Sequence, residues 1–268
     1  MKLGIIRGYS EEMFRYTKEH GLDFIEVCTN FDNESQAFID AKDSIKALIA
    51  KYELPILSVG RWNSEPVKDG KINPDCVALL KEEIAVAAEI GSPVFNLGVN
   101  RDESITLYQN YVLAVEYLRD MLDFAAEKGI TLALYNCAWG NFLCCDKAWD
   151  VVLPELPGLM IKYDCSHTYG RGDDYLAELL KWGNRIAHMH VKGSVIQQNT
   201  APFDKSIYVD DPPAGMDALQ WTKIFAVLYK VGYNGTMSIE PHSATWQGDL
   251  GEAGINFTID FARKFMLR

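Results

Sequence analysis

Eight short apolar runs, separated by longer segments with helical periodicity, constrain the fold of this 268-residue chain more than any other feature. The runs show little polar alternation, which is typical of strands buried on both faces of a parallel sheet. They lie at residues 3–6, 24–28, 55–60, 93–99, 130–136, 159–164, 186–192 and 236–241. We therefore predict eight buried strands, each followed by a helical segment.

The helical segments carry recognisable ends. Three of the clearest span residues 73–92, 103–129 and 217–235, and they stop near Gly91, Gly129 and Gly232. A glycine after the last apolar position is a common C-terminal helix stop. Eight strand–helix units predict an α/β fold, a single-domain (β/α)8 TIM barrel over residues 1–268. A doubly wound open sheet is the main rival, but no glycine-rich turn follows the first strand.

Charge and hydropathy exclude several classes of partner. The net charge is −11, and nucleic acids and anionic membranes are bound through clustered lysine and arginine, so we expect neither. The N-terminal apolar stretch is too short for a signal peptide, and no run approaches the length of a membrane span. These features predict a cytoplasmic protein with six reduced cysteines. The oligomeric state stays open, a homo-oligomer included.

One connection is long. Residues 193–215 follow the seventh strand, and long connections in compact domains are often functional lids. Because this loop leaves the C-terminal face of the predicted barrel, where barrel enzymes keep their active sites, we predict that it is a lid.

Three of the strands end on residues that can bind a metal ion. Asp164, His190 and Glu240 close the sixth, seventh and eighth runs. Alone, each has an ordinary explanation: a capping aspartate, a core histidine, and a glutamate paired with a lysine. Together they place two carboxylates and one imidazole on neighbouring parts of the barrel rim, a set that suits Mn²⁺, Mg²⁺, Co²⁺ or Zn²⁺. We therefore predict one divalent metal ion.

The second half of the chain resembles the xylose isomerase-like TIM barrel superfamily, specifically the sugar phosphate isomerase/epimerase group that also contains AP endonucleases. The similar segments are "KYDCSHTYGRGDD", "RIAHMHVKGS" and "PPAGMDALQWTKIFAVLYKVGYNGTMSIEPHS". The resemblance implies metal ligation by Asp164, His190 and Glu240, and substrate contact by His167 and Lys192. It also implies a small-molecule sugar or polyol as the partner.

Two positions depart from the family pattern. The fifth strand of the family normally ends Leu-Glu-Asn, and its glutamate is the fourth metal ligand and half of an acid–base pair in isomerising members. Here Tyr135 stands at that position, followed by Asn136, and Gly193 stands where the family usually has aspartate. An unperturbed tyrosine has a pKa of ~10, so near neutral pH it is a proton donor and not a base.

Three functions remain open at this point. The first is a divalent-metal-dependent isomerase or epimerase of a sugar, keto sugar or polyol, with Glu240 as base. The second is a metal-dependent lyase, such as a dehydratase or a C-glycoside-cleaving subunit, with Tyr135 as acid. The third is a non-catalytic sugar-binding protein. Asn136, His242 and Trp62 are further candidates for substrate contact, with ordinary packing as the alternative for the last two.

Overall fold

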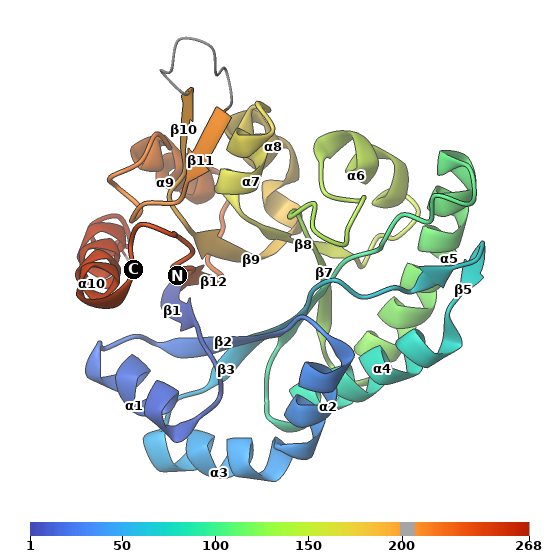
Figure 1. The fold of residues 1–268 in the computed structure, drawn as a ribbon, viewed down its shortest axis with the longest axis horizontal. Coiled ribbons are helices and arrows are strands. Elements are labelled where there is room, and N and C mark those ends of the chain that lie inside the picture. Colours follow the sequence, from blue (N-terminus) through green and yellow to red (C-terminus); the bar gives the residue numbers. More distant parts are fainter. Residues whose placement is uncertain (199–206, 268) are drawn as a thin grey trace.

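The computed structural model describes residues 1–198 and 207–267, and its centre is a closed barrel of eight parallel strands (Figure 1). The order around the barrel is β1-β12-β9-β8-β7-β6-β3-β2. The strands are β1 (Lys2–Ile6), β2 (Phe24–Thr29), β3 (Ile56–Arg61), β6 (Val94–Leu97), β7 (Thr131–Tyr135), β8 (Met160–Tyr163), β9 (Ile186–Val191) and β12 (Thr236–Ile239). Each predicted run overlaps one of these strands. The (β/α)8 prediction is confirmed, and the rival open sheet is wrong.

Helices surround the barrel on its outer face (Figure 1). They are α1 (Glu11–Glu19), α2 (Asp32–Asp40), α3 (Lys42–Tyr52), α4 (Pro74–Glu89), α5 (Leu107–Glu127), α6 (Asp146–Val152), α7 (Cys165–Gly170), α8 (Tyr175–Trp182), α9 (Trp221–Lys230) and α10 (Gly248–Arg263). The start of α4 is fixed by Asn73, whose side chain accepts the Cys76 amide, and by Pro74 in the first turn. Gly91 and Gly129 follow α4 and α5 with φ of 81° and 72°, as helix stops require.

The apolar core lies between the outside of the barrel and the helices. Ile5, Ile25, Phe95 and Leu134 are fully buried there, and they belong to one continuous cluster. Burying a side chain of this size contributes about 1.5–3 kcal/mol. This outer layer is therefore the main source of stability for the barrel.

The inside of the barrel carries a hydrogen-bonded chain of polar residues. Asn96 Nδ2 donates to Ser58 Oγ (2.8 Å), and Ser58 Oγ donates to Glu26 Oε1 (3.2 Å). His188 Nε2 lies 2.8 Å from Glu26 Oε2 on the other side. All four side chains are buried. The chain connects β6, β3 and β2 with β9 across the barrel.

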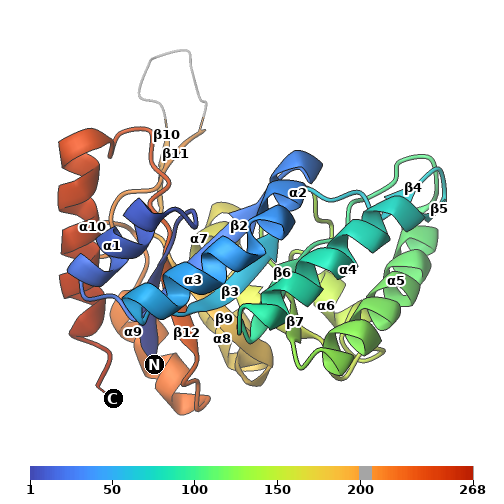
Figure 2. The same ribbon diagram turned by 90° about the horizontal axis from the view of Figure 1, so that it is seen from below.

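Two hairpins extend from one end of the barrel, and Figure 2 shows the chain termini at the opposite end. One pairs β4 (Val67–Lys68) with β5 (Lys71–Ile72), and the other pairs β10 (Val195–Gln198) with β11 (Ile207–Asp210). The second hairpin belongs to the predicted lid, residues 193–215, of which 199–206 lie outside the described residues. Its function as a lid stays a prediction.

Two further observations concern the chain as a whole. The six cysteines are all free, as the sequence predicts. Within residues 1–198 and 207–267, no helix has both the length and the apolar character that a membrane crossing needs.

Candidate active site

The carboxyl ends of β8, β9 and β12 bring the three predicted metal ligands together. His190 Nδ1 lies 2.8 Å from Glu240 Oε2 and 3.9 Å from Asp164 Oδ2. Asp164 is fully buried, whereas the Glu240 side chain keeps 18% of its surface exposed. The fold therefore places all three in one small region, with Glu240 nearest to solvent.

The buried carboxylate of Glu26 orients His190. His190 Nε2 donates to Glu26 Oε2 (2.9 Å), and the same oxygen is 2.8 Å from His188 Nε2. Both histidines face into the barrel, as their spacing of two residues on one strand predicts. This contact turns Nδ1 of His190 toward Asp164 and Glu240. Burial lowers the pKa of His190, but the charges of Glu26 and Glu240 outweigh it, so the pKa is raised.

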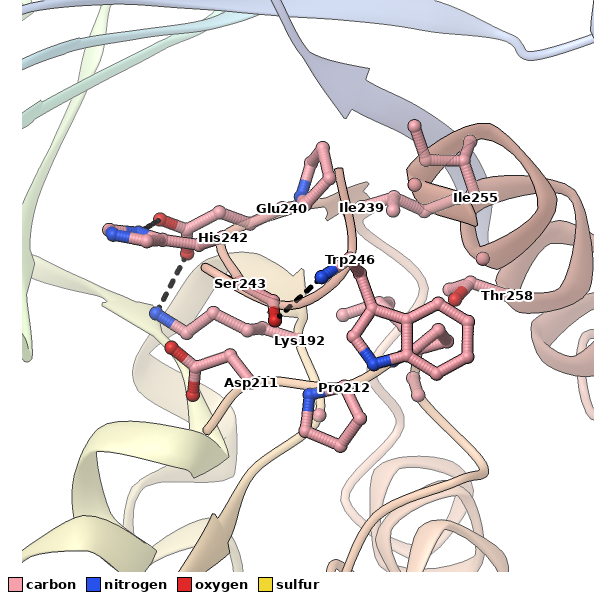
Figure 3. A pocket seen from close by; sticks show the side chains of 17 residues that line it. Lys192, Asp211, Pro212, Ile239, Glu240, His242, Ser243, Trp246, Ile255 and Thr258 are labelled. Atoms are coloured by element: carbon pink, nitrogen blue, oxygen red, sulfur yellow. Dashed lines mark hydrogen bonds and ion pairs between the residues drawn. The ribbon is translucent and has the colours of Figure 1, made fainter. Parts of the chain in front are cut away.

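Lys192 lies between the two carboxylates, and Figure 3 shows its side chain directed at Glu240. Its Nζ is 3.0 Å from Glu240 Oε2, 3.2 Å from Asp164 Oδ2 and 3.3 Å from His167 Nε2. Burial would raise the pKa of Asp164, but the charges of Lys192 and His167 lower it to about 2. Burial would likewise raise the pKa of Glu240. The charges of Lys192 and His190 outweigh this effect and hold the pKa well below its usual range. Both carboxyl groups are therefore ionised at neutral pH.

A second buried lysine, which our sequence analysis missed, completes the cluster. Lys162 Nζ lies 2.8 Å from His190 Nδ1 and 5.5 Å from the centre of the Trp62 ring. The sequence did contain a signal for it. Lys162 stands two residues before Asp164 in the predicted run 159–164, and side chains two apart in an extended segment face the same way.

Tyr135, at the strand-five position, is packed away from the carboxylates. Its hydroxyl donates to the Trp139 carbonyl (3.0 Å) and accepts the Asn63 amide (3.4 Å), so both contacts are with loop backbone. Its ring stacks on Trp62 with 5.2 Å between centroids. A Cβ at Gly98 would lie only 2.5 Å from the Tyr135 hydroxyl, so glycine there makes room for the ring. Burial raises the pKa of Tyr135 far above 10.

The remaining predicted contacts divide into two sets. His167 is 3.5 Å from Asp164 Oδ2 with 25% of its side chain exposed, and His242 is 3.3 Å from Glu240 Oε1 with 72% exposed. These two and Lys192 border the cluster. Asn136 is fully buried and exchanges hydrogen bonds of 2.8 and 2.9 Å with the backbone of Asp164, while Trp62 is buried against Tyr135. These two support the site from behind.

A cavity of about 220 Å³ opens beside Lys192. Ser166 and Ser194 line it, and their buried hydroxyls have no hydrogen-bond partner among the described residues. Lys192 and Asp211 also line a second hollow that contains Glu240, His242 and Trp246 (Figure 3). Burial raises the pKa of Asp211 to about 6. The two hollows therefore meet at Lys192, next to the cluster.

The second departure from the family pattern, Gly193, has a steric cause. A Cβ on Gly193 would lie 2.1 Å from the Pro212 carbonyl oxygen and 3.0 Å from Asp217 Cβ. Asp217 accepts the Ser194 amide (3.1 Å) and the Trp221 indole N–H (3.0 Å). The Pro212 carbonyl thus blocks a side chain at position 193, and Asp217 crowds the same space.

The donor atoms suit a divalent metal ion, but the charge around them does not. The ligand atoms of Asp164, His167 and Glu240 lie within 4.8 Å of one another, as do those of Glu26, His188 and His190. Yet Lys162 contacts the free nitrogen of His190, and Lys192 contacts both carboxylates. At an effective dielectric constant of about 20, unit charges 4 Å apart interact by about 4 kcal/mol, and a divalent ion doubles this. Repulsion from these two ammonium groups offsets attraction by Asp164 and Glu240, and the third carboxylate, Glu26, is bonded to His188 and His190.

Several known proteins are similar to this chain. Residues 14–264 match the family described as xylose isomerase-like TIM barrel. An inosose dehydratase from Geobacillus thermodenitrificans (strain NG80-2) is 24% identical over 165 residues, which cover 58% of this chain and 53% of that relative, about half its length.

Two solved structures are similar over nearly the whole chain. A 3-keto-D-glucoside 4-epimerase from E. coli superposes with a TM-score of 0.76 at 16% identity, covering 98% of this chain and 99% of that one. A D-psicose 3-epimerase from Clostridium cellulolyticum H10, solved with D-tagatose, has a TM-score of 0.77 at 15% identity, covering 99% of both chains. At these identities the likeness shows the fold. With the family match, it establishes that this chain belongs to the xylose isomerase-like TIM barrel family.

Proposed function

We propose that this protein is an enzyme that acts on a sugar, a keto sugar or a polyol that carries a keto group, by removing a proton from the carbon next to the carbonyl, with Glu240 as the base. The contact between Glu240 and Lys192 carries the proposal, because Lys192 also lines the cavity of about 220 Å³ beside the cluster. The names of the similar proteins, two sugar epimerases and a dehydratase, support it.

In this proposal Glu240 and Lys192 have different roles. While Lys192 contacts Glu240, the pKa of the carboxyl stays low and Glu240 is a weak base. A substrate carbonyl oxygen that accepts a hydrogen bond from Lys192 relaxes this contact. The basicity of Glu240 then rises, while the ammonium stabilises negative charge that develops on the oxygen. The hydroxyls of Ser166 and Ser194, which have no partner among the described residues, can bond the hydroxyl groups of the substrate.

The metal-dependent form of this proposal follows from the sequence. In it Asp164, His190 and Glu240 hold one divalent ion, Mn²⁺, Mg²⁺, Co²⁺ or Zn²⁺. This form requires Lys162 and Lys192 to leave the donor atoms that they contact. It stays a prediction, and metal analysis of the purified protein tests it.

Isomerisation or epimerisation is the first candidate reaction, and a lyase reaction is the second. Epimerisation needs a proton delivered from the face opposite the base, and no carboxylate stands at position 135. The Tyr135 hydroxyl is bonded to the Trp139 carbonyl, which favours chemistry with one base, such as dehydration or cleavage of a C-glycoside. The lyase with Tyr135 as acid requires this hydroxyl to turn toward the substrate.

One experiment separates these reactions. A panel of keto sugars and polyols is incubated with the protein in D₂O and followed by NMR. Deuterium in an epimer indicates an epimerase, and an unsaturated or dehydrated product indicates a lyase. Glu240→Gln should abolish exchange, whereas Glu19→Gln, a control on the exposed surface of α1, should not. Sugar binding without exchange or product would instead identify a non-catalytic sugar-binding protein and refute the proposal.

A further inference from the structure

Lys162 occupies a distinctive place in the barrel. It is the register partner of Tyr135 on the neighbouring strand. Tyr135 bonds loop backbone, while Lys162 extends into the cluster and reaches Nδ1 of His190, the nitrogen that also faces Glu240. At this edge of the cluster, where the family pattern has a glutamate, the chain therefore carries an ammonium group.

The net charge is the same whether this edge of the cluster holds a glutamate with a divalent ion or Lys162. A glutamate ligand together with a divalent ion contributes a net charge of plus one, and Lys162 alone contributes the same. Lys192 adds a second ammonium, in contact with both Asp164 and Glu240. The two lysines thus balance Asp164 and Glu240 without any added ion, while the third buried carboxylate, Glu26, is held by His188 and His190. Both side chains are buried, so water screens these charges little.

We infer that Lys162 and Lys192 take the place of the divalent ion in this site. Lys162 is a positioning residue, because it is buried behind His190. Lys192 lines both hollows and presents its ammonium group to a bound oxygen. The contact of Lys192 with substrate rests on the proposed function, whereas the replacement of the ion by lysine does not.

The test measures binding of Mn²⁺ to the full chain by calorimetry, with thermal unfolding as a second readout. The wild-type protein should bind no Mn²⁺ in the micromolar range after treatment with a chelator, and Mn²⁺ should leave its Tm unchanged. Tyr135→Glu combined with Lys162→Met restores the carboxylate and removes one ammonium, so it should bind Mn²⁺ at least roughly ten-fold more tightly. Its Tm should then rise with Mn²⁺. Lys223→Met, an exposed position on α9, is the matched control and should behave as wild type.

Uptake of one equivalent of Mn²⁺ by the wild-type protein with micromolar affinity would overturn the inference. If the double variant does not fold, as shown by circular dichroism, the wild-type titration decides alone. The outcome is separable from that of the proposed function. A protein without metal that turns over no sugar would refute the proposed function and leave the lysine replacement intact. Turnover that a chelator abolishes would refute the lysine replacement and leave the proposed function intact.

Discussion

The mouth of the barrel has two halves, one at the carboxyl ends of β2 and β3 and the other at the carboxyl ends of β8, β9 and β12. Buried charges are paired differently in the two halves. In the first half, each donor atom has its own acceptor: Arg61 Nη1 donates to Ser35 Oγ (2.8 Å), Arg61 Nη2 donates to Asp32 Oδ1 (2.5 Å), and Thr29 Oγ1 donates to Glu83 Oε1 (2.7 Å). In the second half, single atoms serve several partners. His190 Nδ1 faces both Lys162 and Glu240, and Lys192 Nζ contacts three side chains.

The difference indicates where a ligand can enter. A group with one dedicated partner becomes unsatisfied when that partner is withdrawn, which costs about 1–3 kcal/mol. A shared atom keeps another partner when one leaves. We therefore expect substitutions in the first half to change stability, and substitutions in the second half to change turnover.

The largest effect should come from Glu240→Gln in the second half. Loss of the proposed base should lower kcat on the substrate found by the sugar panel by roughly 10²–10⁴-fold. The free energy of unfolding, from urea denaturation, should change much less, because Glu240 is partly exposed and Gln keeps its shape. A Glu240→Gln variant that is unstable but fully active would contradict the expectation that substitutions in the second half change turnover and not stability.

Glu83→Gln tests the first half through pH. Burial raises the pKa of Glu83 from 4.5 to about 7. Between these values the native state binds more protons than the unfolded state, so this group makes wild-type stability fall as pH rises through the window. The loss should reach roughly 3 kcal/mol. Urea denaturation at several pH values should show a flatter profile for Glu83→Gln. Parallel profiles would show that Glu83 is not buried as a neutral acid.

Arg61→Met should destabilise by about 1.5–3 kcal/mol, the range for hydrogen bonds to charged groups. The substitution removes the donor to Ser35 and Asp32 and keeps most of the buried volume. Urea denaturation measures the loss, and kcat should remain within a few-fold of wild type. A large fall in kcat at unchanged stability would instead show that Arg61 takes part in catalysis.

Tyr135→Phe should have the smallest effect. It removes the hydrogen bond to the Trp139 carbonyl and the longer one (3.4 Å) from the Asn63 amide, and it keeps the ring that stacks on Trp62. We therefore expect a loss of about 0.5–1.5 kcal/mol. Turnover should be retained. If kcat falls roughly 100-fold or more, Tyr135 acts as the acid that the lyase hypothesis requires.

Much of the fold could be predicted because the signals are local. Apolar runs such as 130–136 and 186–192 predict strands at β7 and β9, and Asn73 and Gly91 mark both ends of α4. The convergence of Asp164, His190 and Glu240 was also predictable, since parallel strands in a closed barrel end at one rim. Their identity as metal ligands stays a prediction.

Other parts of the site required the structure. Lys162 belongs to the predicted strand, but only the packing shows that its ammonium reaches His190. The sequence suggested that Tyr135 faces the site, and it could not reveal that the hydroxyl is taken by the Trp139 carbonyl. Nor could it show that the Pro212 carbonyl and Asp217 leave no room for a side chain at Gly193.

The sequence by itself determined the alternation of strand and helix, the closed barrel, and the rim on which the polar residues gather. These follow from hydrophobic periodicity, which each segment carries within a few residues. Tertiary structure alone decided which charges neutralise one another. Lys162 and Lys192 contact residues on strands far apart in the chain, and at these distances a shift of a few ångströms changes which partner an ammonium group binds.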